Sequence, residues 1–429
     1  MRSEAGRPFK GSANILRVLG PGLVTGAADD DPSGIATYSQ AGAQFGYALC
    51  WTMFLTLPLM AAIQIISANL GWQTRRGLAH NLAQHVPRPV LYGLVLLLVM
   101  ANTINIAADL AAMADVLRLV FGGPGLAYTI GFGLACLVAE VFIPYHRYAG
   151  YLKFLTLVLL VYVASAFSVH VPWSQVIGAT LVPVLLPDRD YLLTIVAVLG
   201  TTISPYLFFW QASQEAEESQ LSYRNALGPG EPRPDRSFAD ISVDTWVGML
   251  FSNLVAFFII VTTAATLNAH GVVHIETASQ AAEALRPVAG DLTFVLFAAG
   301  IIGTGLLAVP ILAGSAAYAV AEIFGLSGSL ELPASRALGF YGIVGAATLG
   351  GAGLAVTPID PIAMLFWSAV INGLVAVPIM ITLMLVISSA AGRQKFAFPR
   401  WLNALGWLAS AMMVLVVALF LAFSLHTSP

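Results

Sequence analysis

Charged residues and cysteines are both scarce in this sequence. Only 10% of its 429 residues are charged, 19 of them basic and 22 acidic, while 58% are hydrophobic. Soluble domains carry about 25% charged residues, so the composition excludes an ordinary soluble enzyme, a nucleic-acid-binding protein and a disordered chain. The net charge of −3 is too small to indicate a charged partner. Cys50 and Cys136 lie far apart in apolar runs, so we expect neither a disulfide framework nor a cysteine metal motif.

Catalytic motifs are absent as well. The chain contains no hydrolase triad motif, no phosphate-binding glycine loop and no zinc motif. We therefore expect no enzyme activity and no cofactor. Residues 1–13 are polar and basic and lack the apolar core of a cleavable signal, so we expect the N-terminus to be retained.

Long apolar runs fill most of the chain, and the mean hydropathy is +0.83. A helix needs about 20 mostly apolar residues to cross the hydrocarbon core of a bilayer. Eleven stretches satisfy this condition: 18–45, 48–71, 90–117, 126–143, 151–171, 190–213, 243–268, 291–325, 337–353, 361–390 and 401–425. The sequence therefore predicts an all-α polytopic membrane protein, with the lipid bilayer as its surroundings and one transmembrane domain over residues 1–429.

The basic residues favour one orientation of these spans. If the N-terminus is cytoplasmic and the spans alternate, every Lys and Arg except Arg118, Arg189 and Arg286 falls on the cytoplasmic side. Basic residues collect in cytoplasmic loops of membrane proteins. We therefore expect a cytoplasmic N-terminus and, after eleven spans, a C-terminus outside.

Three consecutive acids interrupt the first span. Asp29–Asp31 precede Pro32 and Gly34, which remove a backbone donor and relax the chain, so we expect the helix to break here. Broken backbone persists at membrane depth only where it is buried in protein or lines a cavity, and it leaves carbonyls free. Carbonyls and carboxylates together favour a hard metal ion or Na⁺. The alternative is a surface loop, which would leave residues 15–28 without a membrane role.

The sixth span carries a second interruption, at Gly200–Tyr206, where Pro205 again breaks the hydrogen-bond ladder. An ordinary proline kink is the alternative. Paired broken helices in corresponding halves are the strongest sequence indication of a transporter site. We therefore expect two inverted five-helix repeats, at about 14–171 and 188–390, followed by an extra helix at 401–425.

Further polar residues lie within the predicted spans. Asn102, Asn105 and Asp109 share one helix face, which either lines a water path or bonds neighbouring helices. Gln211 continues the polar stripe of the sixth span, and Asn372 precedes a glycine in the tenth. We expect Asn102, Asp109, Gln211 and Asn372 to line the transport path.

Several motifs resemble those of the NRAMP family of divalent-metal transporters over about residues 14–390. The segment Asp31-Pro32-Ser33-Gly34 is similar to the Asp-Pro-Gly-Asn motif of the family's first helix. The resemblance extends to Ala68-Asn69-Leu70-Gly71, Asn253-Leu254 and the residues Gly305, Gly314 and Glu322. It implies a leucine-transporter-like fold, with a 5+5 inverted repeat, broken helices 1 and 6 and about eleven helices.

The resemblance implies a metal site at the two breaks. Asp31 would be the principal ligand, with the carbonyls of Ala28 and Thr201 and with Ser204 bound directly or through water. We expect Asp30 and Tyr206 to lie next to the residues that bind the ion, without binding it directly.

Two departures from the family pattern bear on which ion is bound. Gly34 stands at the family's Asn position and leaves room for ion-bound water, which suits Mg²⁺. Ser204 stands where the family has a methionine, whose thioether selects softer metals. The chain thus resembles a divergent branch similar to the NRAMP-related magnesium transporters.

The titratable residues of the family's proton route are also largely replaced. Asn102, Tyr206 and Gln211 stand at those positions, while Asp109 is kept. We therefore expect a transporter of Mg²⁺ or Mn²⁺ that works by alternating access with weak or absent proton coupling, in a bacterial inner or plasma membrane. The oligomeric state is open, and a monomer is compatible with the sequence.

Three other functions stay open. They are a proton-coupled Mn²⁺/Fe²⁺ importer, a Na⁺-coupled transporter of a small organic solute or anion, and a membrane receptor that binds an ion without moving it.

Overall fold

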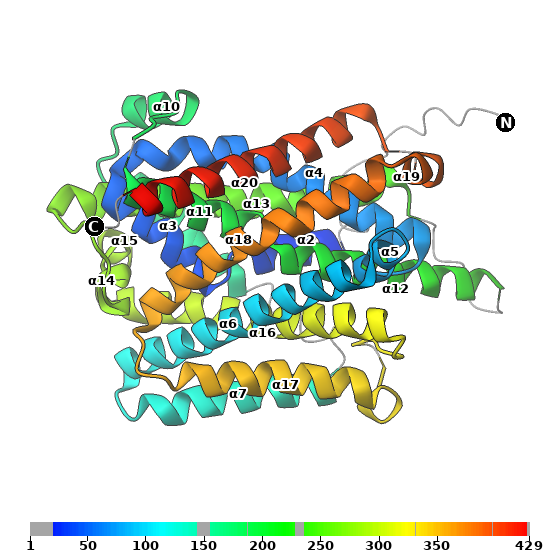
Figure 1. Ribbon diagram of the computed structural model, residues 1–429. Coiled ribbons are helices and arrows are strands. Elements are labelled where there is room, and N and C mark those ends of the chain that lie inside the picture. The colour runs from blue at the N-terminus through cyan, green and yellow to red at the C-terminus, as the bar shows by residue number, and fades with distance from the viewer. Residues whose placement is uncertain are drawn as a thin grey trace.

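A computed structural model describes residues 20–143, 155–186, 188–227, 236–330, 332–396 and 398–426 (Figure 1). Within these residues the regular structure is helical throughout and contains no strand, which confirms the predicted all-α class. The predicted N-terminal basic segment, residues 151–154 of the fifth predicted span and residues 228–235 of the loop after the sixth lie outside the described residues.

The first half of the chain forms helices of very different lengths. They are α2 (Pro21–Asp29), α3 (Pro32–Phe45), η1 (Gly46–Leu49), α4 (Cys50–Thr74), α5 (Leu78–Ala83), α6 (Arg88–Phe121), α7 (Gly125–Phe142), η2 (Leu155–Leu159), α9 (Leu160–Ser168) and α10 (Trp173–Leu181).

The second half continues in the same manner. It comprises α11 (Arg189–Thr202), α12 (Pro205–Leu227), α13 (Phe238–Thr266), η3 (Asn268–His270), α14 (Ala278–Glu283), α15 (Arg286–Ala289), η4 (Gly290–Leu292), α16 (Thr293–Phe324), η5 (Ala334–Arg336), α17 (Leu338–Ala355), α18 (Pro361–Ser388), α19 (Ala390–Lys395) and α20 (Arg400–His426).

Nine helical stretches of the described residues are long and apolar enough to cross a membrane, or ten if a bent pair counts as one span. Eleven were expected. One stretch, Pro32–Thr74, joins α3, η1 and α4 and has 43 residues. Its helical length of about 65 Å is twice the hydrocarbon thickness, so it contains one whole predicted span and part of another. In the bent pair, α9 and α10 meet at 119°, so α10 does not continue across the membrane. With α4 counted separately and the bent pair once, the described helices correspond to the eleven predicted stretches.

Both predicted helix breaks are present. The first separates α2 from α3 at Asp30 and Asp31, and the second separates α11 from α12 at Ile203 and Ser204. Each following helix begins with a proline, which needs no hydrogen-bond partner for its nitrogen at this position. Asp31 is extended, with φ −67° and ψ 170°, and its Oδ1 accepts from Gly34 N at 2.7 Å, so it caps α3.

The half-helices pack closely against long neighbours. A Cβ on Gly26 of α2 would lie 2.2 Å from the Gly248 carbonyl of α13, and a Cβ on Gly200 of α11 would lie 2.1 Å from the Ala369 carbonyl of α18. Small residues let helix backbones approach this closely in membranes. In Figure 1, α7 and α17 lie together along one edge of the bundle, away from α2.

An acid on α13 holds the first turn of α2. The Asp244 carboxylate accepts from the backbone N–H groups of Gly20, Gly22 and Leu23 at 2.9, 2.9 and 3.0 Å. These groups have no partner within α2 itself. A negative charge at this end also complements the positive end of the helix dipole. Asp244 therefore anchors α2 to α13.

Arg236 extends this anchor to α12. Its guanidinium donates to Asp244 at 2.8 Å and to Glu215 and Glu218 at 3.1 Å. Burial opposes the charge, but the carboxylates of Glu215 and Asp244 raise the pKa of Arg236 above its usual value. The charged network fixes α2, α12 and α13 to one another at one end of the bundle.

We predict that Asp244→Ala lowers the stability of the purified protein by about 2 kcal/mol, because three N–H groups lose a charged acceptor and Arg236 loses a partner. Asp240→Ala is the matched control. Asp240 lies on the same helix but caps only its own end with Ser237, so its loss should cost about 1 kcal/mol or less. Thermal unfolding followed by tryptophan fluorescence compares the two. Equal melting temperatures would contradict the anchoring role.

Candidate metal centre at the helix breaks

The Asp31 carboxylate lies where three helices converge. It is buried, and its Oδ1 accepts from Gly34 N of α3. Its Oδ2 accepts from Asn105 Nδ2 of α6 at 3.0 Å and from the Tyr206 hydroxyl of α12 at 3.4 Å. The contacts hold the carboxylate in one orientation between the two broken helices.

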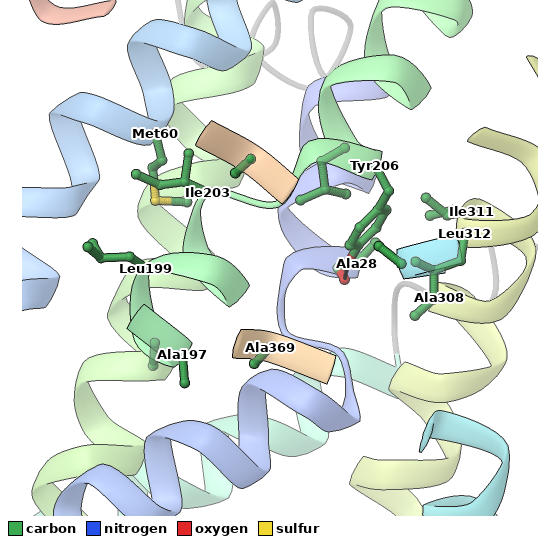
Figure 2. Close-up of a cluster of buried hydrophobic side chains, with 14 of the residues drawn as sticks. Ala28, Met60, Ala197, Leu199, Ile203, Tyr206, Ala308, Ile311, Leu312 and Ala369 are labelled. Atoms are coloured by element: carbon green, nitrogen blue, oxygen red, sulfur yellow. Dashed lines mark hydrogen bonds between the residues drawn. The ribbon is translucent and has the colours of Figure 1, made fainter. Parts of the chain in front are cut away.

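Tyr206 also reaches the end of α2. Its hydroxyl donates to the Ala28 carbonyl at 3.1 Å, and Figure 2 shows the tyrosine ring beside Ala28. The last carbonyls of a helix have no intrahelical partner, and this one lies next to the break. Because a hydroxyl has one hydrogen, Tyr206 bonds either Ala28 or Asp31 at a given moment. Carbonyl and carboxylate oxygens have more than one lone pair, so both acceptors keep capacity for a cation.

Gly34 brings the two breaks together. A Cβ at this position would lie 3.0 Å from Thr201 Oγ1 and 3.3 Å from the Asp29 carbonyl. The start of α3 therefore packs against the last turn of α11. The missing side chain at position 34 is thus a packing requirement as well as a departure from the family motif.

Ser204 is directed back onto α11. Its hydroxyl contacts the carbonyls of Thr201 and Gly200 at 2.7 and 2.9 Å. A carbonyl oxygen has two lone pairs and a hydroxyl oxygen keeps its own, so both Thr201 and Ser204 retain acceptor capacity for a cation.

Asp30, expected near the ligands of Asp31, is directed elsewhere. Asp29 Oδ2 and Asp30 Oδ1 lie 2.6 and 3.1 Å from the Ser252 hydroxyl of α13. The three carboxylates thus occupy two sides of the break, with Asp31 facing α6 and α12 and the other pair facing α13.

The four residues expected along the transport path differ in their surroundings. Asn102 donates to Ser315 Oγ and to the Leu312 carbonyl of α16, and Gln211 donates to Thr245 of α13. These amides bond neighbouring helices rather than the residues at the breaks. Asn372 is buried in α18, and its Oδ1 has no hydrogen-bond partner in the part of the chain that the structure describes.

Asp109 stands apart from these amides. It is fully buried, and neither of its carboxylate oxygens has a hydrogen-bond partner among the described residues. A buried carboxylate without partners is costly, which makes it a functional candidate.

The sequence places Asn105 on the polar helix face shared with Asn102 and Asp109, but it gives no sign that Asn105 bonds Asp31. Ser252 is a residue of this centre that the sequence does not single out, because a lone serine in an apolar helix is common. Only the packing of α13 against the break brings Ser252 to the carboxylates of Asp29 and Asp30.

Buried carboxylates without basic partners dominate the electrostatics of this centre. None of the ion pairs found among the described residues involves Asp29, Asp30, Asp31 or Asp109. Within the same part of the chain, no group of three or more His, Cys, Asp and Glu side chains is arranged to hold a metal. A cation here would therefore depend on few carboxylates and several neutral oxygens, a hard donor set.

The centre is closed in this structure. On one side lies a cavity of about 10 Å³, no larger than one water, beside Ser39 and Asp115. On the other lies a cavity of about 400 Å³ lined by Arg75, Ser213 and Glu322. Asp31 lines neither cavity, so an ion reaches it only after the helices move.

Comparisons with known proteins agree with this geometry. The profile of the family described as natural resistance-associated macrophage protein-like (Nramp) matches residues 22–423. The divalent metal cation transporter MntH of Yersinia pestis (strain Pestoides F) is 28% identical over 298 residues, which cover 68% of this chain and 69% of the relative. MntH of Verminephrobacter eiseniae is 29% identical over 305 residues, covering 69% and 66%.

Solved transporters share the fold. The manganese transporter of Eremococcus coleocola, in complex with an aromatic bis-isothiourea compound, has a TM-score of 0.70 at 18% identity, over 96% of this chain and 88% of that one. Mhp1, a nucleobase-cation-symport-1 family transporter, has a TM-score of 0.57 at 12% identity, over 94% and 92%. The predicted leucine-transporter-like fold with broken helices is confirmed.

We predict that Asp31→Ala reduces divalent-cation uptake about 100-fold or more while the protein still folds and inserts, because the ion loses its one charged ligand at the break. Glu140→Gln is the matched control. Glu140 is equally buried, but it bonds Thr348, far along the chain from the break. Uptake into proteoliposomes containing equal amounts of each protein measures the effect. Uptake by Asp31→Ala near that of Glu140→Gln would place the site elsewhere.

Proposed function

Because the chain belongs to the Nramp family of divalent-metal transporters, we propose that it moves a hard divalent cation, Mg²⁺ or Mn²⁺, across the membrane by alternating access. The metal is substrate rather than resident cofactor, and the chain is a multi-pass membrane protein, not an enzyme. The proposal also includes two more specific points, the preference for Mg²⁺ or Mn²⁺ and the weak or absent proton coupling.

One observation carries the proposal: the Asp31 carboxylate is buried at a helix break without a basic partner. The carbonyl of Ala28 and the Asp31 carboxylate share the Tyr206 hydroxyl and keep further lone pairs that can face an ion. The Thr201 carbonyl and Ser204 oxygen at the second break add neutral donors. A buried charge that costs this much free energy is retained where a bound cation compensates it.

The donor set favours a hard ion. Carboxylate, carbonyl and hydroxyl oxygens suit Mg²⁺ and Mn²⁺, whereas a thioether would favour softer metals. Met60 of α4 accepts from Asn253, and in Figure 2 its side chain points toward Ile203 rather than toward Ala28. Its sulfur thus contacts α13 rather than the Asp31 carboxylate.

We also propose the two repeats at about 14–171 and 188–390, and an orientation with the N-terminus in the cytoplasm of a bacterial cell. The breaks support the repeats, since each follows a short half-helix, α2 or α11, and precedes a helix that begins with proline. Arg75, Arg76 and Arg236 support the orientation through the cytoplasmic bias of basic residues.

A proton-coupled Mn²⁺/Fe²⁺ importer is the second candidate. Asp109 favours it, because its two buried oxygens have no hydrogen-bond partners within the described ranges and a proton would remove its charge. Competition among Mg²⁺, Mn²⁺ and Fe²⁺ in proteoliposomes, with the internal pH recorded, distinguishes the two candidates.

We predict that Ser204→Met shifts selectivity toward Mn²⁺ and Cd²⁺ over Mg²⁺ by about tenfold, because a thioether prefers softer ions. Ser204→Leu is the control, since leucine has nearly the volume of methionine but no sulfur. Competition assays against labelled Mn²⁺ give the ranking. If both variants keep the ranking of the unmodified protein, position 204 does not face the ion.

We predict that metal uptake by the unmodified protein occurs without stoichiometric acidification of the lumen. Asn102 and Gln211 cannot titrate, and both are occupied in bonds between helices. A pH-sensitive dye inside the liposomes measures proton entry during Mn²⁺ uptake. Acidification that follows uptake, and that disappears in Asp109→Asn, would instead support the proton-coupled importer.

A further inference from the structure

Asn105 of α6 places a side-chain amide directly against the Asp31 carboxylate. The residue is fully buried, and its Nδ2 donates to Asp31 Oδ2 at 3.0 Å. The other end of the same amide, Oδ1, has no hydrogen-bond partner among the described residues. Nearly all buried polar atoms in proteins have a partner, so an exception requires an explanation. Here the exception is an oxygen acceptor in a group that touches the principal ligand of the proposed ion.

An amide oxygen without a partner does not by itself single out Asn105. Asn102, one turn earlier on α6, also has a buried Oδ1 for which the described part of the chain supplies no partner. Its amino group, however, bonds the Leu312 carbonyl and Ser315 of α16. Asn105 differs from Asn102 because its amino group bonds a carboxylate at the helix break.

An amide can present either of its two ends to a neighbour. The amino end donates and the carbonyl end accepts, and a half-turn about the last side-chain bond exchanges them with little change in shape. Opposite the Asp31 carboxylate alone, the amino end is attracted and the carbonyl end is repelled. Beside a cation bound to Asp31, the carbonyl end is attracted instead. The preferred orientation of the Asn105 amide therefore reverses when a cation binds.

The position of this amide fits octahedral coordination. Oxygens about 2.1 Å from Mg²⁺ lie about 3.0 Å apart when they are adjacent in an octahedron. Asn105 Nδ2 and Asp31 Oδ2 are 3.0 Å apart, and a half-turn would bring Asn105 Oδ1 to the place of Nδ2. The oxygen can therefore reach an ion bound to Asp31 without movement of α6.

The first broken helix cannot supply such an oxygen from position 34. Gly34 has no side chain, and a Cβ there would already lie 3.0 Å from Thr201 Oγ1, so a larger side chain would have to displace α11. Gly34 N bonds Oδ1 of Asp31, whereas Asn105 bonds Oδ2. Helix α6 thus approaches the oxygen of the carboxylate that Gly34 leaves accessible.

We propose that Asn105 is a further ligand of the divalent ion and that its amide turns over on binding, from a hydrogen-bond donor to Asp31 to an oxygen ligand of the ion. The inference rests on the proposed function, because it takes Asp31 as the principal ligand. An amide oxygen is a hard donor, so it favours Mg²⁺ and Mn²⁺ over softer ions. It is also neutral, and it adds no negative charge beside Asp109, which is buried one turn further along the same helix face.

Mn²⁺ binding to the purified full-length protein, measured from the EPR signal of free Mn²⁺, distinguishes a ligand from a residue that only positions Asp31. Asn105→Leu removes both ends of the amide and should weaken binding about tenfold or more. Asn105→Asp keeps an oxygen but, when ionised, cannot donate to Asp31, so it should bind Mn²⁺ at least as tightly as the unmodified protein. Asn69→Asp is the matched control, since this buried amide bonds the Ile65 carbonyl of its own helix, and it should leave binding unchanged. Equal weakening in Asn105→Asp and Asn105→Leu would overturn the ligand role, because the donated hydrogen bond would then be what matters.

A spectroscopic measurement on the unmodified protein does not depend on the folding of any variant. The protein is labelled with asparagine that carries ¹³C at the side-chain carbonyl and is saturated with Mn²⁺. Electron–nuclear double resonance then detects labelled carbons near the ion, and a coordinated amide places its carbon about 3 Å away. We expect this coupling in the unmodified protein and its loss in Asn105→Asp. Absence of the coupling from the unmodified protein, or its persistence in Asn105→Asp, would overturn the proposal.

The same experiments separate this proposal from the proposed function. Mn²⁺ that is bound with the carbon coupling but is not moved into proteoliposomes would reject transport and retain Asn105 as a ligand. Uptake that requires Asp31, is normal in Asn105→Leu and is accompanied by no carbon coupling would do the reverse.

Discussion

The cost of burying negative charge at a broken helix is the constraint on which this structure depends. Asp29, Asp30 and Asp31 are buried together, and no ion pair among the described residues compensates them. Such charge is stable inside a membrane protein only where polar groups and cations surround it. Helices α3, α6, α12 and α13 each donate a hydrogen bond to one of these carboxylates. The Asp31 centre and the contact of Asp29 and Asp30 with Ser252 both follow from the burial of these three carboxylates at the break.

The short helix α2 connects this centre to one end of the bundle. Its last turn offers the Ala28 carbonyl to Tyr206, and its first turn is bonded to Asp244, whose partner Arg236 also holds Glu215. Between the two ends, backbone contact with α13 leaves little freedom for independent movement. Movement of α2 relative to α13 therefore requires the contacts of Asp244 to break. If the proposed alternating access moves α2 in this way, it must overcome these contacts.

The sequence was sufficient to predict the fold and the two helix breaks, but not the directions of the side chains. Pro32 and Pro205 each begin the helix that follows a break. Proline alone does not decide a break, because Pro58, Pro310 and Pro378 lie inside continuous helices. What marks the two breaks in the sequence is proline directly after polar residues, Asp29–Asp31 at the first and Ser204 at the second. Helical spacing placed Asn102 and Asn105 on one face, yet only packing decides that one bonds α16 and the other Asp31. Likewise, Asp30 turns to Ser252, a partner more than 200 residues away, for which the sequence gives no signal.

The central claim is that the first break binds a hard divalent cation through Asp31. Anomalous X-ray diffraction from crystals grown with Mn²⁺ tests it most directly, because the signal locates the ion itself. The account predicts a peak within coordination distance, about 2–2.5 Å, of an Asp31 oxygen, with the carbonyls of Ala28 and Thr201 among the other ligands. A peak bound by other residues, or saturated Mn²⁺ binding in solution with no peak at the break, would contradict it.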